Sequence, residues 1–168
     1  LSEFERRMTE TLLPRLEYDF DFLFIDDGST DGSWRMIHDI CKRNKHFRGI
    51  RLSRNFGAHV ALSAGITHAT GDAVATLACD LQDPPEVILN FLAKWSSGFK
   101  VVYGVRPKRQ GTSFLFKSIA KYYYRLISSL SETKIPNDTG DFRLIDKVVV
   151  DKLRQMKEEN RYYRGMVA

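Results

Sequence analysis

Residues 20–33 read FDFLFIDDGSTDGS and join a short apolar run to two adjacent carboxylates and a glycine turn. The apolar residues 20–25 predict a buried strand, which ends at Asp26 and Asp27. Helical spacing of apolar residues follows over residues 33–44. A strand, a tight turn and a helix in this order indicate the first unit of an alternating α/β sheet.

The same alternation of strand and helix continues along the chain. Further strands are predicted at residues 49–53, 73–79 and 100–105. Further helices are predicted at residues 1–16, 58–69, 113–130 and 147–159, with another that begins near residue 83. This order favours an α/β fold with a mostly parallel sheet.

The composition bounds the class of protein. The 168 residues suffice for one compact domain, expected over residues 1–168, and 43% hydrophobic with 28% charged residues is a globular profile. Two cysteines, Cys41 and Cys79, are too few for a disulfide framework or a zinc cage. Because the chain begins at Leu1 and ends abruptly, we expect a piece of a longer protein that lacks the first strand and any C-terminal membrane segment.

The net charge of +5 is unevenly distributed. Residues 87–131 contain eight Lys or Arg and no Asp or Glu, so all other residues together carry −3. A basic stretch beside an acidic remainder favours an anionic partner on one side, although a solvated basic face gives the same pattern. Nucleic acid is not the expected partner, because it would leave the acidic motifs described below unexplained.

Polar residues follow the first two predicted strands, at the edge where parallel α/β sheets bind ligands. Asp26 and Asp27 can accept hydrogen bonds from a nucleobase edge or a ribose hydroxyl. A turn with a helix cap would explain Gly28 but not two adjacent carboxylates. Arg54 and Asn55 occupy the corresponding place after the second strand.

Asp80 and Gln82 follow the third predicted strand, in the segment DLQDPPE of residues 80–86. A carboxylate and a second oxygen donor two residues later can hold one hard cation, and magnesium prefers few protein ligands plus the oxygens of a diphosphate. The alternative is a strand-to-helix turn in which Asp83 caps the helix.

Arg106, Arg109 and Ser113 come soon after the fourth predicted strand. Guanidinium groups match phosphate oxygens in pairs, and a hydroxyl at a helix start adds a further donor. A solvated basic loop is the alternative explanation for this segment.

Residues 137–144, NDTGDFRL, place Asp138 and Asp141 beside Arg143 in what we expect to be a loop. An aspartate next to an arginine stays ionised at neutral pH, which suits binding of a sugar hydroxyl or weak general-base catalysis. A salt-bridged turn explains Arg143 equally well.

Five segments, taken together, resemble the family 2 glycosyltransferases. They are IDDGSTDGS, LSRNFGAHVALSAGITHATGD, DLQDPPE, GVRPKR and NDTGDFRL, in the order of the family. Within the family the chain is similar to bacterial undecaprenyl-phosphate glycosyltransferases and dolichyl-phosphate mannosyltransferases, from about Asp21 to Gly165. The resemblance implies a GT-A type fold, with a Rossmann-like, mostly parallel sheet and helices on both faces.

The resemblance also implies roles for individual residues. The nucleotide sugar would contact Asp26, Asp27, Arg54, Asn55, Gly57 and Asp80, and Mg2+ or Mn2+ would be held by Asp80 and Gln82. The acceptor phosphate would contact Arg106, Arg109 and Ser113, and catalysis would involve Asp138, Asp141 and Arg106, with no distinction yet between the two aspartates.

The implied reaction moves a sugar from a nucleotide diphosphate sugar, expected to be a UDP-sugar, to a polyprenyl phosphate. The implied location is the cytoplasmic face of a membrane, in the synthesis of cell-wall or surface polysaccharide, and oligomer formation stays open. Another acceptor, such as a growing polysaccharide, is the first alternative. A degenerate nucleotide-sugar-binding module is the second, because Ala78 stands where the family often has a metal-binding Asp.

Two other enzyme classes fit the sequence less well. A nucleotidyltransferase would show a glycine-rich phosphate loop near its start, and a dinucleotide dehydrogenase would show a Gly-x-Gly-x-x-Gly turn; neither is present in these residues. The chain also departs from the family at its start, where a first strand with a Pro-Val-Tyr-Asn-Glu type segment is absent.

Overall fold

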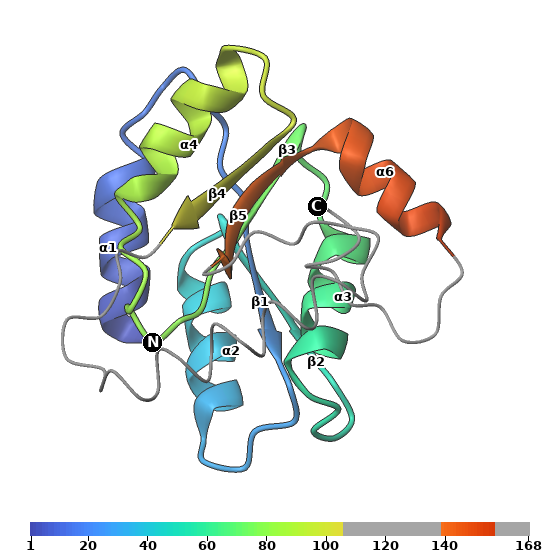
Figure 1. Ribbon diagram of the computed structural model, residues 1–168. Helices are drawn as coiled ribbons and strands as arrows, with labels where there is room; N and C mark the ends of the chain where they lie inside the picture. The colour runs from blue at the N-terminus through green and yellow to red at the C-terminus, as the bar shows by residue number, and fades with distance from the viewer. Residues whose placement is uncertain (106–138, 157–168) are drawn as a thin grey trace, which may run out of the picture.

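A computed structural model describes residues 1–105 and 139–156 of the chain (Figure 1). Its helices are α1 (Ser2–Leu12), α2 (Ser33–Arg43), α3 (Ala58–His68), α4 (Val87–Ser96) and α6 (Lys147–Gln155). Its strands are β1 (Phe22–Asp26), β2 (Phe47–Arg51), β3 (Ala73–Thr76), β4 (Val101–Val105) and β5 (Thr139–Asp146). The α/β class predicted from the sequence is therefore confirmed.

The strands form two hydrogen-bonded groups. Strands β1 and β2 pair in parallel, with Phe22 opposite Phe47 and Asp26 opposite Arg51. Strand β5 lies between β3 and β4 and is antiparallel to both. Strands β3 and β4 therefore run in the same direction, and β5 is the strand that departs from the parallel arrangement.

The expectation of a loop over residues 137–144 was wrong from Thr139 onward, because these residues belong to β5. Residues 142–146 are all buried, so the strand is covered on both faces and shows no alternation of apolar and polar residues. The polar side chains of Asp141 and Arg143 gave the segment the composition of a loop.

Two apolar clusters hold helices against opposite faces of the sheets (Figure 1). The larger cluster includes Phe4, Met8 and Leu12 of α1, Ile37 and Ile40 of α2, and Ile88, Phe91 and Leu92 of α4. The smaller cluster joins Ile66 of α3 to Val150 and Leu153 of α6. Alternate residues of β5 enter the two clusters: Leu144 lies in the larger one and Ile145 in the smaller one.

Helix α4 begins later than the sequence indicates. Glu86 is its N-cap, and a preceding turn is closed by hydrogen bonds from the amides of Val87 and Ile88 to the carbonyls of Pro84 and Pro85. Across residues 1–105 and 139–156, we find no helix with the length and apolar character that crossing a membrane requires.

Candidate functional site

Asp26 ends β1 and is almost completely buried, with 3% of its surface exposed. Its Oδ1 accepts a hydrogen bond from the Ser29 amide at 3.3 Å, and its Oδ2 lies 3.4 Å from Nε of Arg51. Oδ2 is buried and accepts no hydrogen bond, so the charge of Arg51 is what compensates it. Arg51 also donates to the Ser29 carbonyl at 3.1 Å. Asp26 and Arg51 therefore both hold the turn after β1 through the backbone of Ser29.

Asp27 binds the backbone of the segment that follows β2. Its Oδ1 accepts from the Phe56 amide and its Oδ2 from the Gly57 amide, each at 2.8 Å. Hydrogen bonds to an ionised acceptor are stronger than neutral ones. The Asp27 carboxylate therefore clamps the start of α3, for which Gly57 is the N-cap.

Gly28 brings the two segments into direct contact. A Cβ atom at this position would lie 2.7 Å from both the Arg54 Cα and the Asn55 amide nitrogen. Its φ of 71° also falls in the left-handed region that favours glycine. The structure thus gathers Asp27, Arg54, Asn55 and Gly57 at the carboxyl ends of β1 and β2. The family resemblance implies that these residues contact the nucleotide.

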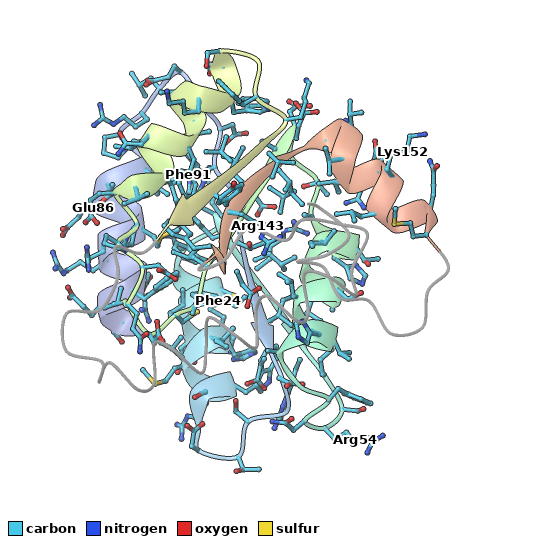
Figure 2. The ribbon with its side chains drawn as sticks, in the orientation of Figure 1. Phe24, Arg54, Glu86, Phe91, Arg143 and Lys152 are labelled. Carbon is cyan, nitrogen blue, oxygen red and sulfur yellow. The ribbon has the colours of Figure 1, made fainter. Side chains whose placement is uncertain are left out.

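The Arg54 side chain lies on the outside of this loop (Figure 2). Its guanidinium carbon is 4.6 Å from the centroid of the Phe56 ring, a cation–π arrangement, and both residues are exposed. An exposed ring and a planar cation beside the Asp27 clamp present groups that can contact a base or a phosphate.

The turn after β3 exposes the two predicted metal ligands. Asp80 and Gln82 are both exposed, and Oδ1 of Asp80 accepts a hydrogen bond from the Gln82 amide at 3.0 Å. Leu81 between them has φ 61°, the one positive φ of a non-glycine residue among those described. Its side chain packs against the larger cluster, which offsets the conformational cost of the turn.

Asp141 lies on β5 next to the end of β3. The hydroxyl of Thr76, the last residue of β3, donates to the Asp141 carbonyl. Oδ1 of Asp141 is 3.7 Å from Nη2 of Arg143, whose side chain is 8% exposed while that of Asp141 is 43% exposed. In the register of the sheet, Arg143 lies opposite Thr76 of β3 and Tyr103 of β4. A buried cation therefore lies beside a partly exposed carboxylate at the end of β3.

The donor set at the Asp80 turn fits a hard cation of the magnesium type. Asp80 and Gln82, which carry a carboxylate and an amide, are both exposed residues, and a cation that takes further oxygens from a diphosphate needs few protein ligands. The described residues contain no group of three His, Cys, Asp or Glu arranged to hold a metal by themselves.

The remaining predicted site residues, Arg106, Arg109, Ser113 and Asp138, lie outside the described residues. Sequence reasoning missed Arg51, the ion-pair partner of Asp26. Its place opposite Asp26 in the parallel pair becomes visible only from the strand register.

Comparisons with known proteins identify the family of the chain. The family model described as glycosyl transferase family 2 matches residues 5–154 of the chain. The chain is 40% identical over its whole length to the uncharacterized glycosyltransferase YkcC of Bacillus subtilis, covering 52% of that protein. Over 96% of its length it is 41% identical to the uncharacterized glycosyltransferase sll0501 of Synechocystis, covering 51% of it.

A third relative is the prophage bactoprenol glucosyl transferase homolog of Escherichia coli. It is 36% identical over 90% of this chain, and the match covers 49% of that protein. The chain thus spans about half the length of the curated relatives it matches. The match over residues 5–154 also confirms the GT-A type of α/β fold that the motifs implied. This chain belongs to glycosyl transferase family 2.

Proposed function

We propose that the chain is the donor-binding and catalytic part of an enzyme that transfers a sugar from a UDP-sugar to a polyprenyl phosphate. The observation that carries the proposal is the exposed Asp80–Gln82 turn after β3. It belongs to the same α/β fold as the loop that Asp27 clamps after β2. The name of the Escherichia coli relative, a bactoprenol glucosyl transferase homolog, supports the lipid acceptor.

On the donor side, Asp27 keeps the segment from Arg54 to Gly57 closed against the turn after β1. Each oxygen of Asp27 already accepts one hydrogen bond from a backbone amide. Because a carboxylate oxygen has two lone pairs, each can accept one more hydrogen bond, from a ribose or a base. Arg54 and Asn55 stay exposed above the clamp and supply the donors for the nucleotide.

Asp80 and Gln82 would hold Mg2+ or Mn2+ together with the diphosphate of the donor. When bound, such a cation neutralises the negative charge that develops on the leaving diphosphate. The hydrogen bond from the Gln82 amide to Asp80 holds the carboxylate in place before a ligand arrives.

In this proposal Asp141 acts on the sugar. Arg143 supports it with a positive charge beside the Asp141 carboxylate. Asp138 and Arg106 belong to the same proposal as further catalytic residues, with Arg106, Arg109 and Ser113 as ligands of the acceptor phosphate. A phosphate is already a nucleophile, so positioning and charge would supply most of the rate. The site of action would be the cytoplasmic face of a membrane.

The test is a calorimetric titration of UDP-glucose into the protein with and without Mn2+, repeated on Asp80→Asn. We expect binding that depends on Mn2+ and that weakens by more than about tenfold in the variant. Asp72→Asn is the matched control, because Asp72 precedes β3 at its other end and its side chain is 83% exposed. Equal Mn2+-dependent affinity in the protein and in Asp80→Asn would refute the metal assignment.

A further inference from the structure

The segment that carries the proposed metal ligands is anchored at both ends. At its start, Leu81 packs against the larger cluster. Toward its end, Pro85 is among the fully buried residues and leads into Glu86, the N-cap of α4. Asp80 and Gln82 lie between or beside these anchors and are themselves exposed. Their placement therefore depends on how firmly the two ends are held.

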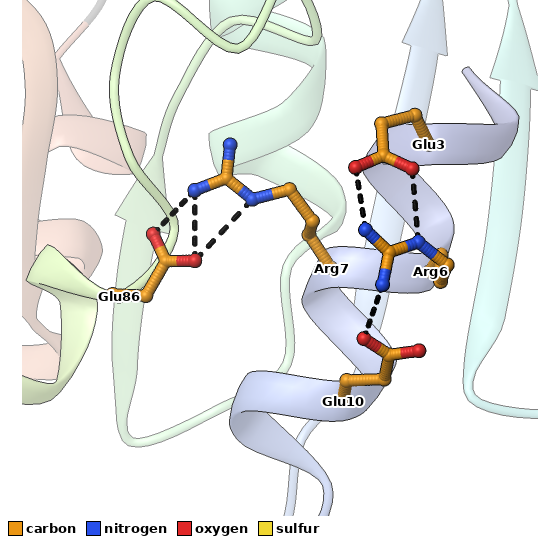
Figure 3. Close-up of polar contacts among 5 residues, drawn as sticks. All are labelled: Glu3, Arg6, Arg7, Glu10 and Glu86. Carbon is orange, nitrogen blue, oxygen red and sulfur yellow. Dashed lines mark hydrogen bonds and ion pairs between the residues drawn. The ribbon is translucent and has the colours of Figure 1, made fainter.

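The second anchor includes an ion pair with α1 (Figure 3). Nη2 of Arg7 lies 2.7 Å from Oε1 and 2.6 Å from Oε2 of Glu86, and Nε of Arg7 donates to Oε1 at 3.3 Å. The hydrogen bond from Arg7 lowers the pKa of Glu86 below its ordinary value, so the pair stays charged at neutral pH. A guanidinium fork on a carboxylate fixes direction as well as distance.

Arg6, the neighbouring residue, makes contacts of the same chemistry that stay within α1 (Figure 3). Its guanidinium pairs with Glu3 at 2.6 Å and also with Glu10. The side chain of Arg6 is 55% exposed, whereas that of Arg7 is 27% exposed. The two arginines thus differ in exposure and in partner, because only Arg7 of the two pairs with Glu86 in the segment after β3.

Helix α1 has other means of staying in place. Phe4, Met8 and Leu12 are buried in the larger cluster, and Glu5 pairs with Arg43 of α2. Removal of the Arg7 side chain should therefore leave α1 packed while it releases Glu86. We therefore expect the loss of the Arg7–Glu86 pair to affect the segment of residues 80–86 more than α1.

We propose that Arg7 is a positioning residue that holds the Asp80–Gln82 turn through Glu86 and thereby sets the affinity for the metal–donor complex. The inference rests on the proposed function for the role of Asp80. It assigns to α1, which carries none of the predicted site residues, a part in preparing the donor site.

The experiment compares Arg7→Ala with the matched variant Arg6→Ala and with the charge exchange Arg7→Glu combined with Glu86→Arg. The first measurement is amide hydrogen exchange of residues 80–86 without metal or donor. The second is calorimetric binding of UDP-glucose with and without Mn2+. We expect Arg7→Ala to speed exchange and weaken Mn2+-dependent binding by about fivefold, the scale of a partly exposed ion pair.

Arg6→Ala should behave as the unchanged protein in both measurements, and the charge exchange should restore both toward their original values. Equal exchange in Arg7→Ala and Arg6→Ala would overturn the inference. Faster exchange with unchanged Mn2+-dependent affinity would also overturn it, because the pair would then be structural only. Absence of Mn2+-dependent binding in the unchanged protein would refute the proposed function, and the role of Arg7 toward a metal would be refuted along with it.

Discussion

The carboxylates at the end of β1, Asp26 and Asp27, differ from Asp80 after β3 in how their oxygens are used. Asp26 is buried, accepts a hydrogen bond from the backbone of its own turn and faces Arg51. Asp27 accepts two hydrogen bonds from the backbone of the segment that follows β2. Asp80 accepts one backbone hydrogen bond, from the Gln82 amide, and stays exposed. The oxygens of Asp26 and Asp27 therefore have contacts within the protein, while Asp80 stays exposed, as the proposed metal role requires.

One local pattern, an acidic residue at or soon after the end of a strand, thus has two different environments. A buried carboxylate needs partners, because leaving it unpaired is costly. An exposed carboxylate is hydrated and can exchange water for a cation. The variants below test this division, with stability as the expected readout on the β1 side.

Gly28→Ala should have the largest effect. A Cβ atom at residue 28 meets the backbone of Arg54 and Asn55, and a φ of 71° is unfavourable for alanine. Overpacking against backbone and left-handed strain together should lower the free energy of unfolding by about 4 kcal/mol. Urea denaturation followed by circular dichroism measures this change.

Gly32→Ala is the control for Gly28. Gly32 has a φ of 87°, but a Cβ atom there meets nothing within 4 Å. It should therefore cost only about 1 kcal/mol, from the backbone conformation alone. Equal losses at the two glycines would show that the segment after β2 does not lie against the turn.

Asp27→Ala should come second. The variant removes two hydrogen bonds from backbone amides to a charged acceptor, in a partly exposed place, and should cost about 2 kcal/mol of stability. Asp31→Ala is the comparison, because Asp31 accepts one amide hydrogen bond, from Ser33, in an exposed local turn. Its loss should be about 0.5 kcal/mol. A smaller loss for Asp27→Ala than for Asp31→Ala would contradict the clamp.

The sequence was sufficient to predict the parallel part of the fold, since β1 is a local apolar run followed by a glycine turn. It was insufficient for β5, because a strand buried on both faces with Arg143 in its middle shows neither alternation nor an apolar run. The antiparallel strand between β3 and β4 is set by long-range pairing, which local patterns do not report.

A similar limit applies to the candidate site. The motifs identified Asp27 and Asp80, because their residue types and their places after strands are visible locally. The contacts that separate their roles were not predictable, because Asp27 binds amides 29 and 30 residues away, and Arg7 binds Glu86 across 79 residues. These pairings depend on the packed structure.

After Gly28 and Asp27, Asp146 offers a smaller expected effect on stability, and one that depends on pH. It ends β5, away from the Asp80 turn, and is buried. Its Oδ1 accepts from the Val148 amide at 2.9 Å, and its Oδ2 from Trp95 at 2.8 Å and from Lys100 at 3.0 Å. The Val148 amide, then Trp95 and Lys100, lower the pKa of this carboxyl.

Because the pKa of Asp146 is lowered in the folded protein, its charge stabilises the fold above the ordinary aspartate pKa of about 4, and this stabilisation is lost as the pH falls through the folded value. Asn at this position retains the helix cap, so Asp146→Asn should cost only about 1 kcal/mol at pH 7. Urea denaturation at pH 7 and pH 3 should show a smaller difference between protein and variant in acid. An unchanged difference would mean that the charge of Asp146 is not what binds Trp95 and Lys100, and that the structural use of buried carboxylates is confined to the β1 side.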